Sequence, residues 1–272
     1  MSTRAAIPTG QPGRGARLGP YALWQLRDYL FDRGVATLLI TALTGYLSAV
    51  PAYLMLKQNF ERPELVARYG SAAAARAAMA HEASAAFLNG TLGVIVFLGA
   101  LLAMNGIVAS DRKLGYFRFL FSKPMSPARY YGQAFAVHLG GWLAIISLLA
   151  FVYGLFVAPL LSVAFLGGLS LVFLCYAGVA FLLSATARWD WLSLVFVTVM
   201  TTLLHQRFGT SSSPFAKLLY LLPPLQETSA VYTALAEGVA LPWHSIAWLG
   251  GYGAACFVAA LVVLRYRRLA II

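Results

Sequence analysis

The stretch Ser110–Gly132, SDRKLGYFRFLFSKPMSPARYYG, separates two long apolar runs and differs in character from both. It holds five Lys or Arg residues against a single acid, Asp111, and its Tyr, Phe and Leu residues give it an apolar side. A segment with one cationic and one aromatic side is typical of the membrane interface, where rings lie near the headgroups and charges face anionic lipid or a protein partner. This stretch therefore predicts a chain that lies in a membrane, with a short interfacial helix between two spans.

Two prolines interrupt the second half of this stretch. Pro124 and Pro127 each lack an N–H and restrict the residue before them, so we expect them to stop the interfacial helix. We predict a turn over Lys123–Pro127 and a new membrane helix that is entered through Tyr130 and Tyr131. On charge alone, the plainest interpretation is a positively charged loop that orients the two flanking spans.

The composition supports a membrane location. Of the 272 residues, 60% are hydrophobic and 11% are charged, which is too apolar for one water-soluble core. The net charge of +11 would indicate nucleic acid as the partner of a soluble protein, but in a membrane protein it must first be divided between the two sides. Cys175 and Cys256 both lie in apolar runs and are expected to pack there, without forming a disulfide or a metal site.

We predict an all-α, polytopic membrane protein with six transmembrane helices. A span needs about 20 apolar residues. The expected spans are 35–56, 85–109, 134–157, 160–187, 191–204 and 243–264. The fifth is too short to cross unaided. Residues 1–19 are rich in Gly, Pro and Arg and are expected to form a disordered basic tail, which leaves 20–272 as a single transmembrane domain.

Helical periodicity also predicts a helix before the first span. Polar residues recur on one side of Pro20–Gly34, opposite a row of leucines: Gln25, Asp28 and Asp32. This pattern is typical of an amphipathic helix on the cytoplasmic surface, an elbow helix, with Trp24 and Phe31 in the interface.

The remaining connections have recognisable signals. Lys57–Ser84 predicts a short external helix or a water-exposed extension of the second span, and Pro63 suits a helix start. Ala158-Pro159 predicts a tight turn at the far interface. Between Phe208 and Glu237 we expect two short re-entrant or surface helices on the external side. In the second span, four glycines should let neighbouring helices approach: Gly90, Gly93, Gly99 and Gly106.

Positive charge sets the expected orientation. With these boundaries, 14 of the 20 Lys and Arg residues lie on the side that holds both termini and Ser110–Gly132. By the positive-inside rule, both termini are cytoplasmic in a multi-pass protein of the inner or plasma membrane. The basic face suits anionic membrane lipids.

The order of features in the opening stretch is specific. An acid-base pair follows an apolar span, and then come Gly115, an aromatic-basic helix, Lys-Pro-x-Ser-Pro and Arg-Tyr-Tyr. This order resembles the cytoplasmic coupling region of the permease subunits of ATP-binding cassette (ABC) exporters, the type 2 ABC permease family. The resemblance is close over Asp111–Gln133 and covers the rest only through the six-span layout. Asp111 stands where many members carry Glu.

The resemblance implies a coupling helix that docks on a separate ATPase subunit, which holds the ATP and Mg. The residues implied in coupling and docking are Asp111, Arg112, Gly115, Tyr116, Phe117, Arg118, Phe119 and Arg129. It also implies a second permease chain, in a homodimer or a heterodimer, with the second and fifth spans lining a path between the two chains. The implied lining residues are Asn89, Phe97, Met104, Asn105, Phe196, Met200 and Leu204, each of which also fits ordinary helix packing.

Two absences in the sequence bear on mechanism. No G-x-x-x-x-G-K-[ST] loop occurs, so a transporter driven by ATP would need its motor in another chain. None of the six predicted spans contains Asp, Glu, Lys or Arg, which disfavours a proton-coupled carrier or an intramembrane hydrolase. An uncharged path suits an amphipathic or hydrophobic solute.

Two other classes of function remain open at this stage. A non-transporting scaffold or assembly factor of a membrane complex would use the basic loop only for orientation. An integral membrane enzyme acting on lipid could use His81 or His205 as a base. The histidines are scattered along the chain, and a packing or interface role is the simpler interpretation of each.

Overall fold

The computed structural model describes residues 19–59, 62–104, 107–108, 111, 126–186, 190–209 and 219–266, and all of its regular structure over these ranges is helical. The elements are α1 (Gly19–Asp28), η1 (Tyr29–Gly34), α2 (Val35–Asn59), α3 (Pro63–Tyr69), α4 (Ala72–Ala86), η2 (Phe87–Thr91), α5 (Leu92–Met104), α8 (Pro127–Phe156), α9 (Val163–Thr186), α10 (Asp190–Phe208), η3 (Leu219–Leu221), α12 (Leu225–Glu237) and α13 (Trp243–Tyr266). The predicted all-α class is confirmed for the described residues.

Five helical stretches of the described chain are long and apolar enough to cross a membrane. They are Leu23–Gln58, Ala72–Met104, Pro127–Phe156, Val163–Thr186 and Trp243–Tyr266. These five helices indicate a multi-pass membrane protein. The predicted fifth span falls on α10, whose apolar part, Leu192–Phe208, is shorter than the others. The predicted basic tail lies outside the described residues apart from Gly19, which begins α1.

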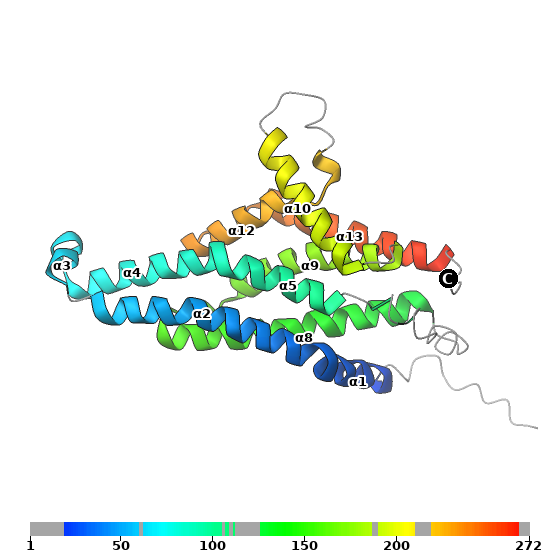
Figure 1. Cartoon of the computed structure of the whole chain (residues 1–272), viewed down its shortest axis with the longest axis horizontal. Coiled ribbons are helices and arrows are strands. Elements are labelled where there is room, and N and C mark those ends of the chain that lie inside the picture. Colours follow the sequence, from blue (N-terminus) through cyan, green and yellow to red (C-terminus); the bar gives the residue numbers. More distant parts are fainter. Residues whose placement is uncertain are drawn as a thin grey trace, which may run out of the picture.

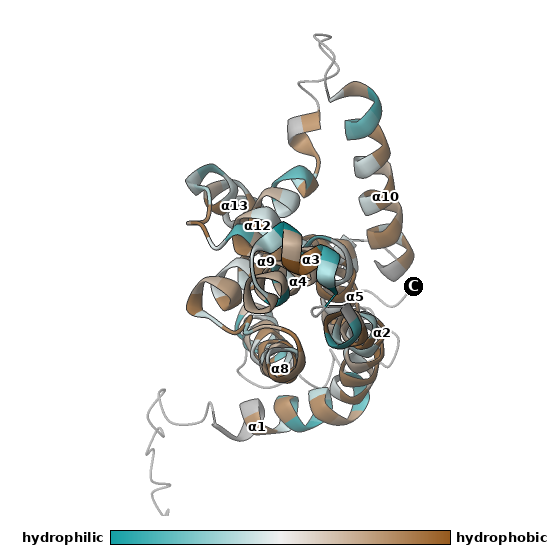
Figure 2. Cartoon of the chain, turned by 90° about the vertical axis from the view of Figure 1, so that its left-hand side faces the viewer, coloured by the Kyte–Doolittle hydropathy of each residue, from teal (hydrophilic) through white to brown (hydrophobic). Residues whose placement is uncertain are grey.

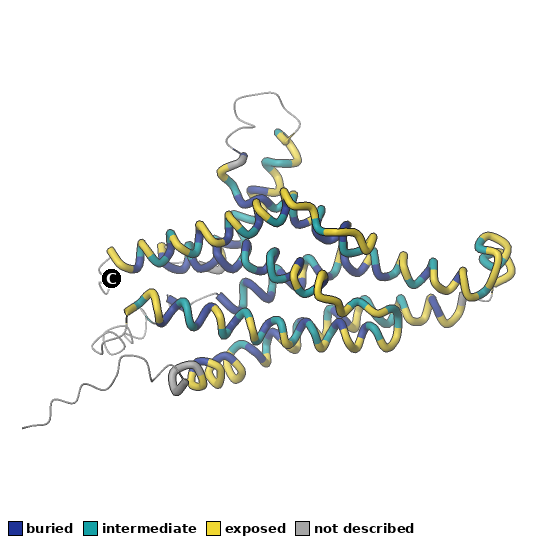
Figure 3. The backbone as a smooth tube through the Cα atoms, turned by 180° about the vertical axis from the view of Figure 1, so that it is seen from behind, coloured by how far each residue is buried: buried dark blue, intermediate teal, exposed yellow. Residues whose placement is uncertain are grey.

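The long helices run side by side along the length of the molecule, and α10 leaves the bundle at a steep angle (Figure 1). Helix α9 is the centre of the bundle, because it packs against α13, α5, α10, α12 and α8. Viewed along the bundle, α10 stands apart from the other long helices (Figure 2). Buried positions face the middle of the bundle and exposed ones face outward (Figure 3).

The N-terminal helix turns at a π-helical segment. α1, η1 and α2 form one uninterrupted helical chain, but α1 lies across the view of Figure 2, whereas α2 is seen nearly end-on. π-Helical turns commonly bend a helix, and here the bend lies at η1, where the Tyr29 ring is buried against His138 with 4.9 Å between ring centroids. The predicted helix over 20–34 is present. Its polar side is divided, because Gln25 is buried while Asp28 and Asp32 are exposed.

The segment between the first two long helices contains both a short helix and an extension of the second span, which the sequence offered as alternatives. Pro63 is the first residue of the short helix α3, as its fixed backbone angle favours. Gly70, at φ 82°, ends α3, and α4 then continues through the π-helical η2 into α5. The second long helix is therefore extended well beyond the predicted start of its span at residue 85.

The third long helix begins earlier than predicted. Pro127, which was predicted to lie in the turn before this helix, is the first residue of α8, where its missing N–H costs nothing because that N–H would have no partner within the helix. The interfacial helix that Pro127 was expected to stop lies outside the described residues apart from Asp111. The Ser126 side chain caps the helix by accepting a hydrogen bond from the N–H of Arg129 at 3.3 Å. The tight turn at Ala158-Pro159 is confirmed, since α8 ends at Phe156 and α9 begins at Val163.

Over its described residues, the connection between α10 and α13 holds one helix and one helical turn. η3 is a single 3-10 turn, and α12 packs over η2, α9 and α13 before Gly238, at φ 68°, ends it. Residues 210–218, part of the region predicted to be re-entrant, lie outside the described residues.

Glycines set the closest helix approaches. A Cβ on Gly178 of α9 would overlap the carbonyl of Gly253 on α13, so the two backbones touch. In the second long helix, a Cβ on Gly99 would overlap the Trp142 indole, but a Cβ on Gly90 would meet nothing within 4 Å. The predicted role of the glycines therefore holds for Gly99 and fails for Gly90, and the tightest seam joins α9 and α13.

Candidate functional site

A polar cluster lies where the opening stretch of the sequence joins the bundle. We call it the Asp111 junction and define it by five residues: Gln25, Arg33, Asp111, Tyr130 and Tyr131. The Tyr131 hydroxyl donates a hydrogen bond to Oδ2 of Asp111 at 3.0 Å. The Arg33 guanidinium donates to the Ala103 carbonyl at 2.7 Å, and Nε2 of Gln25 donates to the Tyr130 carbonyl at 3.3 Å. These bonds connect α1, η1, α5 and the first turns of α8.

The Arg33 contact attaches the elbow to the second long helix. The guanidinium is a charged donor to the Ala103 carbonyl, and hydrogen bonds with a charged partner are stronger than neutral ones. Helical conformation is described again at residues 107–108 and 111, so this contact is made along the helix and not at a helix end.

Burial changes the chemistry of the Asp111 carboxyl. Desolvation raises its pKa to about 6, against the lowering effects of the Tyr131 hydrogen bond and of the Arg33 charge, while Asp28 adds a further raising effect. The charged form is therefore less favoured than in an ordinary Asp, and the carboxyl takes up a proton as the pH falls through about 6. Protonation of Asp111 would remove a negative charge next to Arg33 and leave the Tyr131 contact in place.

The structure describes two of the eight residues implied in coupling. Asp111 is half-buried in the junction, and Arg129 is exposed in the first turn of α8. The other six lie outside the described residues: Arg112, Gly115, Tyr116, Phe117, Arg118 and Phe119. The two described residues flank the segment 112–125, which places its beginning and its end at one corner of the bundle.

The implied lining residues of the second long helix have different surroundings. Asn89 is exposed on η2, Phe97 is half-buried with its ring 5.4 Å from that of Tyr176, and Met104 is fully buried. Asn105 lies outside the described residues. Of the three that are described, only Asn89 is open to the surroundings of a single chain.

The implied lining residues of α10 lie on a more open surface. Phe196 is 60% exposed, Met200 is 39% exposed, and Leu204 is half-buried. α10 packs chiefly on α9 and is not among the close neighbours of α5. Within one chain, the two sets of lining residues are therefore not brought together.

Sequence reasoning missed Gln25 and Arg33 as members of a site. Both were assigned to the surface of an amphipathic helix, where polar side chains are ordinary. The available signal was the position of Arg33 directly before a long apolar run, because a cation at the end of a span commonly pairs with a backbone carbonyl of a neighbouring helix.

Other polar groups do not form a catalytic or metal centre among the described residues. Within these ranges, no three His, Cys, Asp or Glu side chains gather as a metal site would require. Glu227 accepts a hydrogen bond from the Ser245 hydroxyl at 2.6 Å and lies 3.4 Å from Nδ1 of His244. The carboxylate is thus in the middle of this trio, whereas a hydrolytic triad needs the histidine there. Nδ1 of His205 is 2.9 Å from the Thr201 carbonyl in the same helix.

Compared with known proteins, the chain matches no family model and no curated protein.

Proposed function

We propose that this chain is the permease subunit of an ABC exporter of the type 2 permease family, driven by ATP hydrolysis in a separate ATPase subunit that holds the ATP and Mg. In this proposal α10 is the fifth of six spans, both termini are cytoplasmic, and α1 lies in the interface of the inner or plasma membrane. Two permease chains enclose the path. The observation that carries the proposal is the Asp111 junction.

The junction connects the segment 112–125 to three parts of the bundle. Asp111 precedes this segment in the chain and Tyr131 follows it by only a few residues, and a hydrogen bond joins these two residues. Arg33 then connects α5 to the elbow. A force that displaces segment 112–125 would therefore act on α5, α8 and α2 at once. A loop needed only for orientation requires no such connection.

The surface of α10 supports a second chain and an apolar path. Its exposed residues between Leu192 and Leu203 are apolar apart from Thr202: Leu192, Phe196, Val199, Met200 and Leu203. In the proposed dimer this face of α10 and the exposed Asn89 of η2 line the path with those of the partner chain. A lining of this kind suits an amphipathic or hydrophobic solute.

The proposal is tested by placing charge in the docking segment. Phe117→Asp and Phe119→Asp should each abolish co-purification of the ATPase subunit and stimulation of its turnover by solute, because a carboxylate cannot fill an apolar groove. Tyr69→Asp, the same type of change in α3, is the matched control and should alter neither. Unchanged co-purification and unchanged stimulated turnover in both Phe variants would contradict docking.

Sidedness provides an independent test. Ser122→Cys should react with a membrane-impermeant maleimide in inside-out vesicles and stay unlabelled in right-side-out vesicles. Labelling of intact right-side-out vesicles would place the segment on the external side, where no ATPase subunit can reach it.

A further inference from the structure

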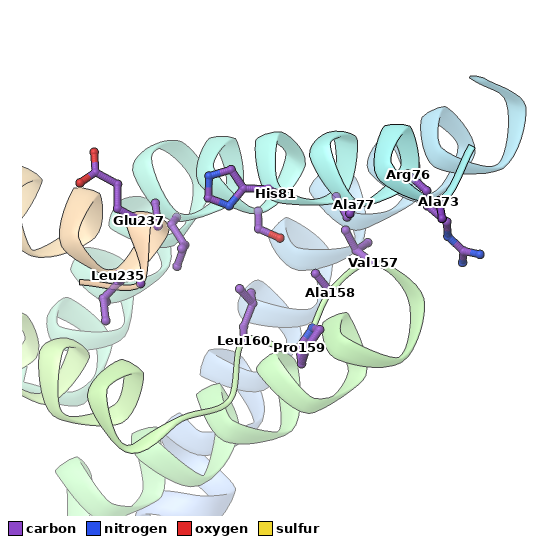
Figure 4. A pocket seen from close by; sticks show the side chains of 15 residues that line it. Ala73, Arg76, Ala77, His81, Val157, Ala158, Pro159, Leu160, Leu235 and Glu237 are labelled. Carbon is purple, nitrogen blue, oxygen red and sulfur yellow. The ribbon is translucent and has the colours of Figure 1, made fainter. Parts of the chain in front are cut away.

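A pocket of about 620 Å³ opens beside α4, away from the Asp111 junction. It is lined by one face of α4, by the turn between α8 and α9, and by the end of α12 (Figure 4). Small-molecule sites usually measure ~300–1,000 Å³, so this pocket is large enough for a ligand. None of the residues implied in coupling or in the transport path lines it.

The charged residues of the lining do not face its interior. Figure 4 shows the charged ends of Arg76 and Glu237 at opposite ends of the pocket and turned away from it. Arg76 also has an interaction of its own. Apart from His81 and Ser84, the other lining residues are apolar. The pocket therefore favours a neutral ligand with a hydrocarbon part.

One polar side chain of the lining is buried without a partner. Ser84 is 7% exposed, and its Oγ has no hydrogen-bond partner in the described chain. The hydroxyl of Tyr153 on α8 is buried too, with the ring stacked on Phe87 at 4.6 Å between centroids. It interacts with Ser84, but neither hydroxyl completes a hydrogen bond. Because buried hydroxyls without partners are unfavourable, this pair is incomplete in the chain alone.

The number of donors selects the group that would complete this pair. Each hydroxyl has one O–H donor and can also accept. If Tyr153 donates to Ser84, the O–H of Ser84 still lacks an acceptor, and the reverse arrangement leaves the O–H of Tyr153 in the same position. A carbonyl oxygen on the ligand supplies an acceptor alone, whereas an alcohol would bring a further donor that needs a partner. An ester carbonyl therefore completes the pair.

The order of residues along α4 matches the order of parts in a lipid ester. Between Glu82 and Asp111 the sequence has no charged residue, and this stretch is long enough to cross the hydrocarbon, for which about 20 residues suffice. Ser84 therefore lies at the boundary between the headgroups and the hydrocarbon, and Leu88 lies one turn further in. A carbonyl at Ser84 places an acyl chain at Leu88 and a headgroup toward His81.

We propose that this pocket binds a neutral fatty-acyl ester with one hydrocarbon chain, of the monoacylglycerol class. The Ser84 hydroxyl donates to the ester carbonyl and accepts from the Tyr153 hydroxyl, and Leu88 and Leu160 contact the chain. The uncharged headgroup lies toward His81. This binding goes beyond the proposed transport function, because nothing in it requires an ATPase subunit or a second chain.

The test uses the full chain purified in digitonin, a neutral detergent that has neither an ester nor a long alkyl chain. The probe is a monoacylglycerol with a diazirine in its acyl chain, and the readout is the extent of photolabelling on peptides of α4, α12 and the α8–α9 turn. The competitors are monododecanoylglycerol, an ester, and 1-O-dodecylglycerol, the ether that lacks the carbonyl. We expect the ester to compete about fivefold better, because only the ester accepts the hydrogen bond.

Paired variants locate the site. Ala80→Trp fills the pocket and should reduce labelling about fivefold or more, whereas Ala74→Trp, on an exposed part of α4 outside the lining, should leave it unchanged. Ser84→Ala removes a hydroxyl that has no partner within the chain, so the fold is retained. It should lower the preference for the ester over the ether from about fivefold to about one. Ser147→Ala, whose hydroxyl bonds to the Leu143 carbonyl of its own helix, is the matched control and should keep the preference.

Three results would overturn the inference. Full labelling of these peptides in Ala80→Trp would show that the probe does not occupy this pocket. Equal competition by the ester and the ether in the parent chain would exclude recognition of a carbonyl. A preference for the ester that persists unchanged in Ser84→Ala would show that the carbonyl is bound by another group. None of these results would bear on docking of the ATPase, which is tested in the segment 112–125.

Discussion

The α9–α13 seam and the Asp111 junction hold the bundle together in opposite ways. In the seam, Gly178 and Gly253 let two backbones touch, and the rings of Phe181 and Phe257 stack beside them with centroids 5.3 Å apart. Small residues allow this close approach in membrane helices, where dispersion replaces the hydrophobic effect as the main attraction. The seam is held by backbone and ring contacts, which depend little on pH.

The Asp111 junction, by contrast, is held by individual hydrogen bonds. It joins three helices through Arg33, Asp111 and the first turn of α8, next to the π-helical η1. Net contributions of single hydrogen bonds are of the order of 1 kcal/mol, so they can be broken one at a time. The seam is therefore held by close packing, whereas the junction is held by contacts that can be lost singly.

The largest effect is expected from crowding the seam. A Cβ at Gly253 would lie 2.6 Å from the Leu174 carbonyl oxygen and 2.9 Å from the Cys175 nitrogen, both backbone atoms that cannot move aside. Gly253→Leu should therefore destabilise the chain by about 3 kcal/mol or more and lower Tm by roughly 6 to 12 °C, measured by thermal unfolding in detergent.

Gly251→Leu is the control for this change. It lies on the same helix, and a Cβ there would meet nothing within 4 Å, so Tm should stay within about 1 °C of the parent value. Equal Tm values for the two variants would show that α9 and α13 are not in backbone contact.

A smaller loss is expected from the junction. Arg33→Met removes the bond to the Ala103 carbonyl and the positive charge beside Asp111, and should cost about 1 to 3 kcal/mol in thermal or denaturant unfolding. Arg27→Met removes the same charge from an exposed position on α1 and should cost less than about 0.5 kcal/mol. A similar loss in both variants would assign the effect to net charge alone, with no special role for the junction.

The Asp111 carboxyl makes the junction sensitive to pH. Its pKa is about 6 in the folded chain, above the ordinary value of 3.8 that applies to the unfolded chain. Below about pH 3 both states hold the proton. As the pH rises from about 3 to 6, the unfolded state ionises first, so stability falls, and above about 6 it stays at the lower level.

Asp111→Asn should remove this dependence. The variant should match the parent at about pH 3 and exceed its stability by about 1 to 2 kcal/mol at pH 7.5, a range that allows for the partial solvent exposure of the carboxyl. Asp32→Asn, at an exposed position of η1, should follow the parent at both pH values. A parent chain that is more stable at pH 7.5 than Asp111→Asn would show that the ionised carboxylate is stabilised in the fold.

The sequence predicted those parts of the fold that depend on local chemistry. Pro63 begins α3 and Ala158-Pro159 turns the chain between α8 and α9 because proline fixes its own backbone angle wherever it occurs. Pro127 was placed in a turn but is the first residue of α8, because proline is excluded from a helix interior and favoured in the first turn.

The parts that depend on distant partners were not predictable. Gly90 and Gly178 look alike in sequence, yet only Gly178 meets another backbone, because contact depends on how helices far apart in the chain cross. The motif singled out Asp111, whose carboxyl accepts a hydrogen bond from the Tyr131 hydroxyl in the structure. Its partners Gln25 and Arg33 were missed, because they lie 86 and 78 residues away along the chain.

The smallest effect concerns a polar contact within the spans. The hydroxyls of Ser48 on α2 and Thr91 on η2 are 2.6 Å apart. A double-mutant cycle of Ser48→Ala and Thr91→Val should give a coupling free energy of about 0.6 kcal/mol, which is typical of interhelical hydrogen bonds in membranes. Thr44→Val, whose hydroxyl bonds only to carbonyls of its own helix, should show no coupling with Thr91→Val. A coupling above about 2 kcal/mol for Ser48 and Thr91 would contradict the division drawn here, because a hydrogen bond outside the Asp111 junction would then stabilise the bundle as strongly as close packing does.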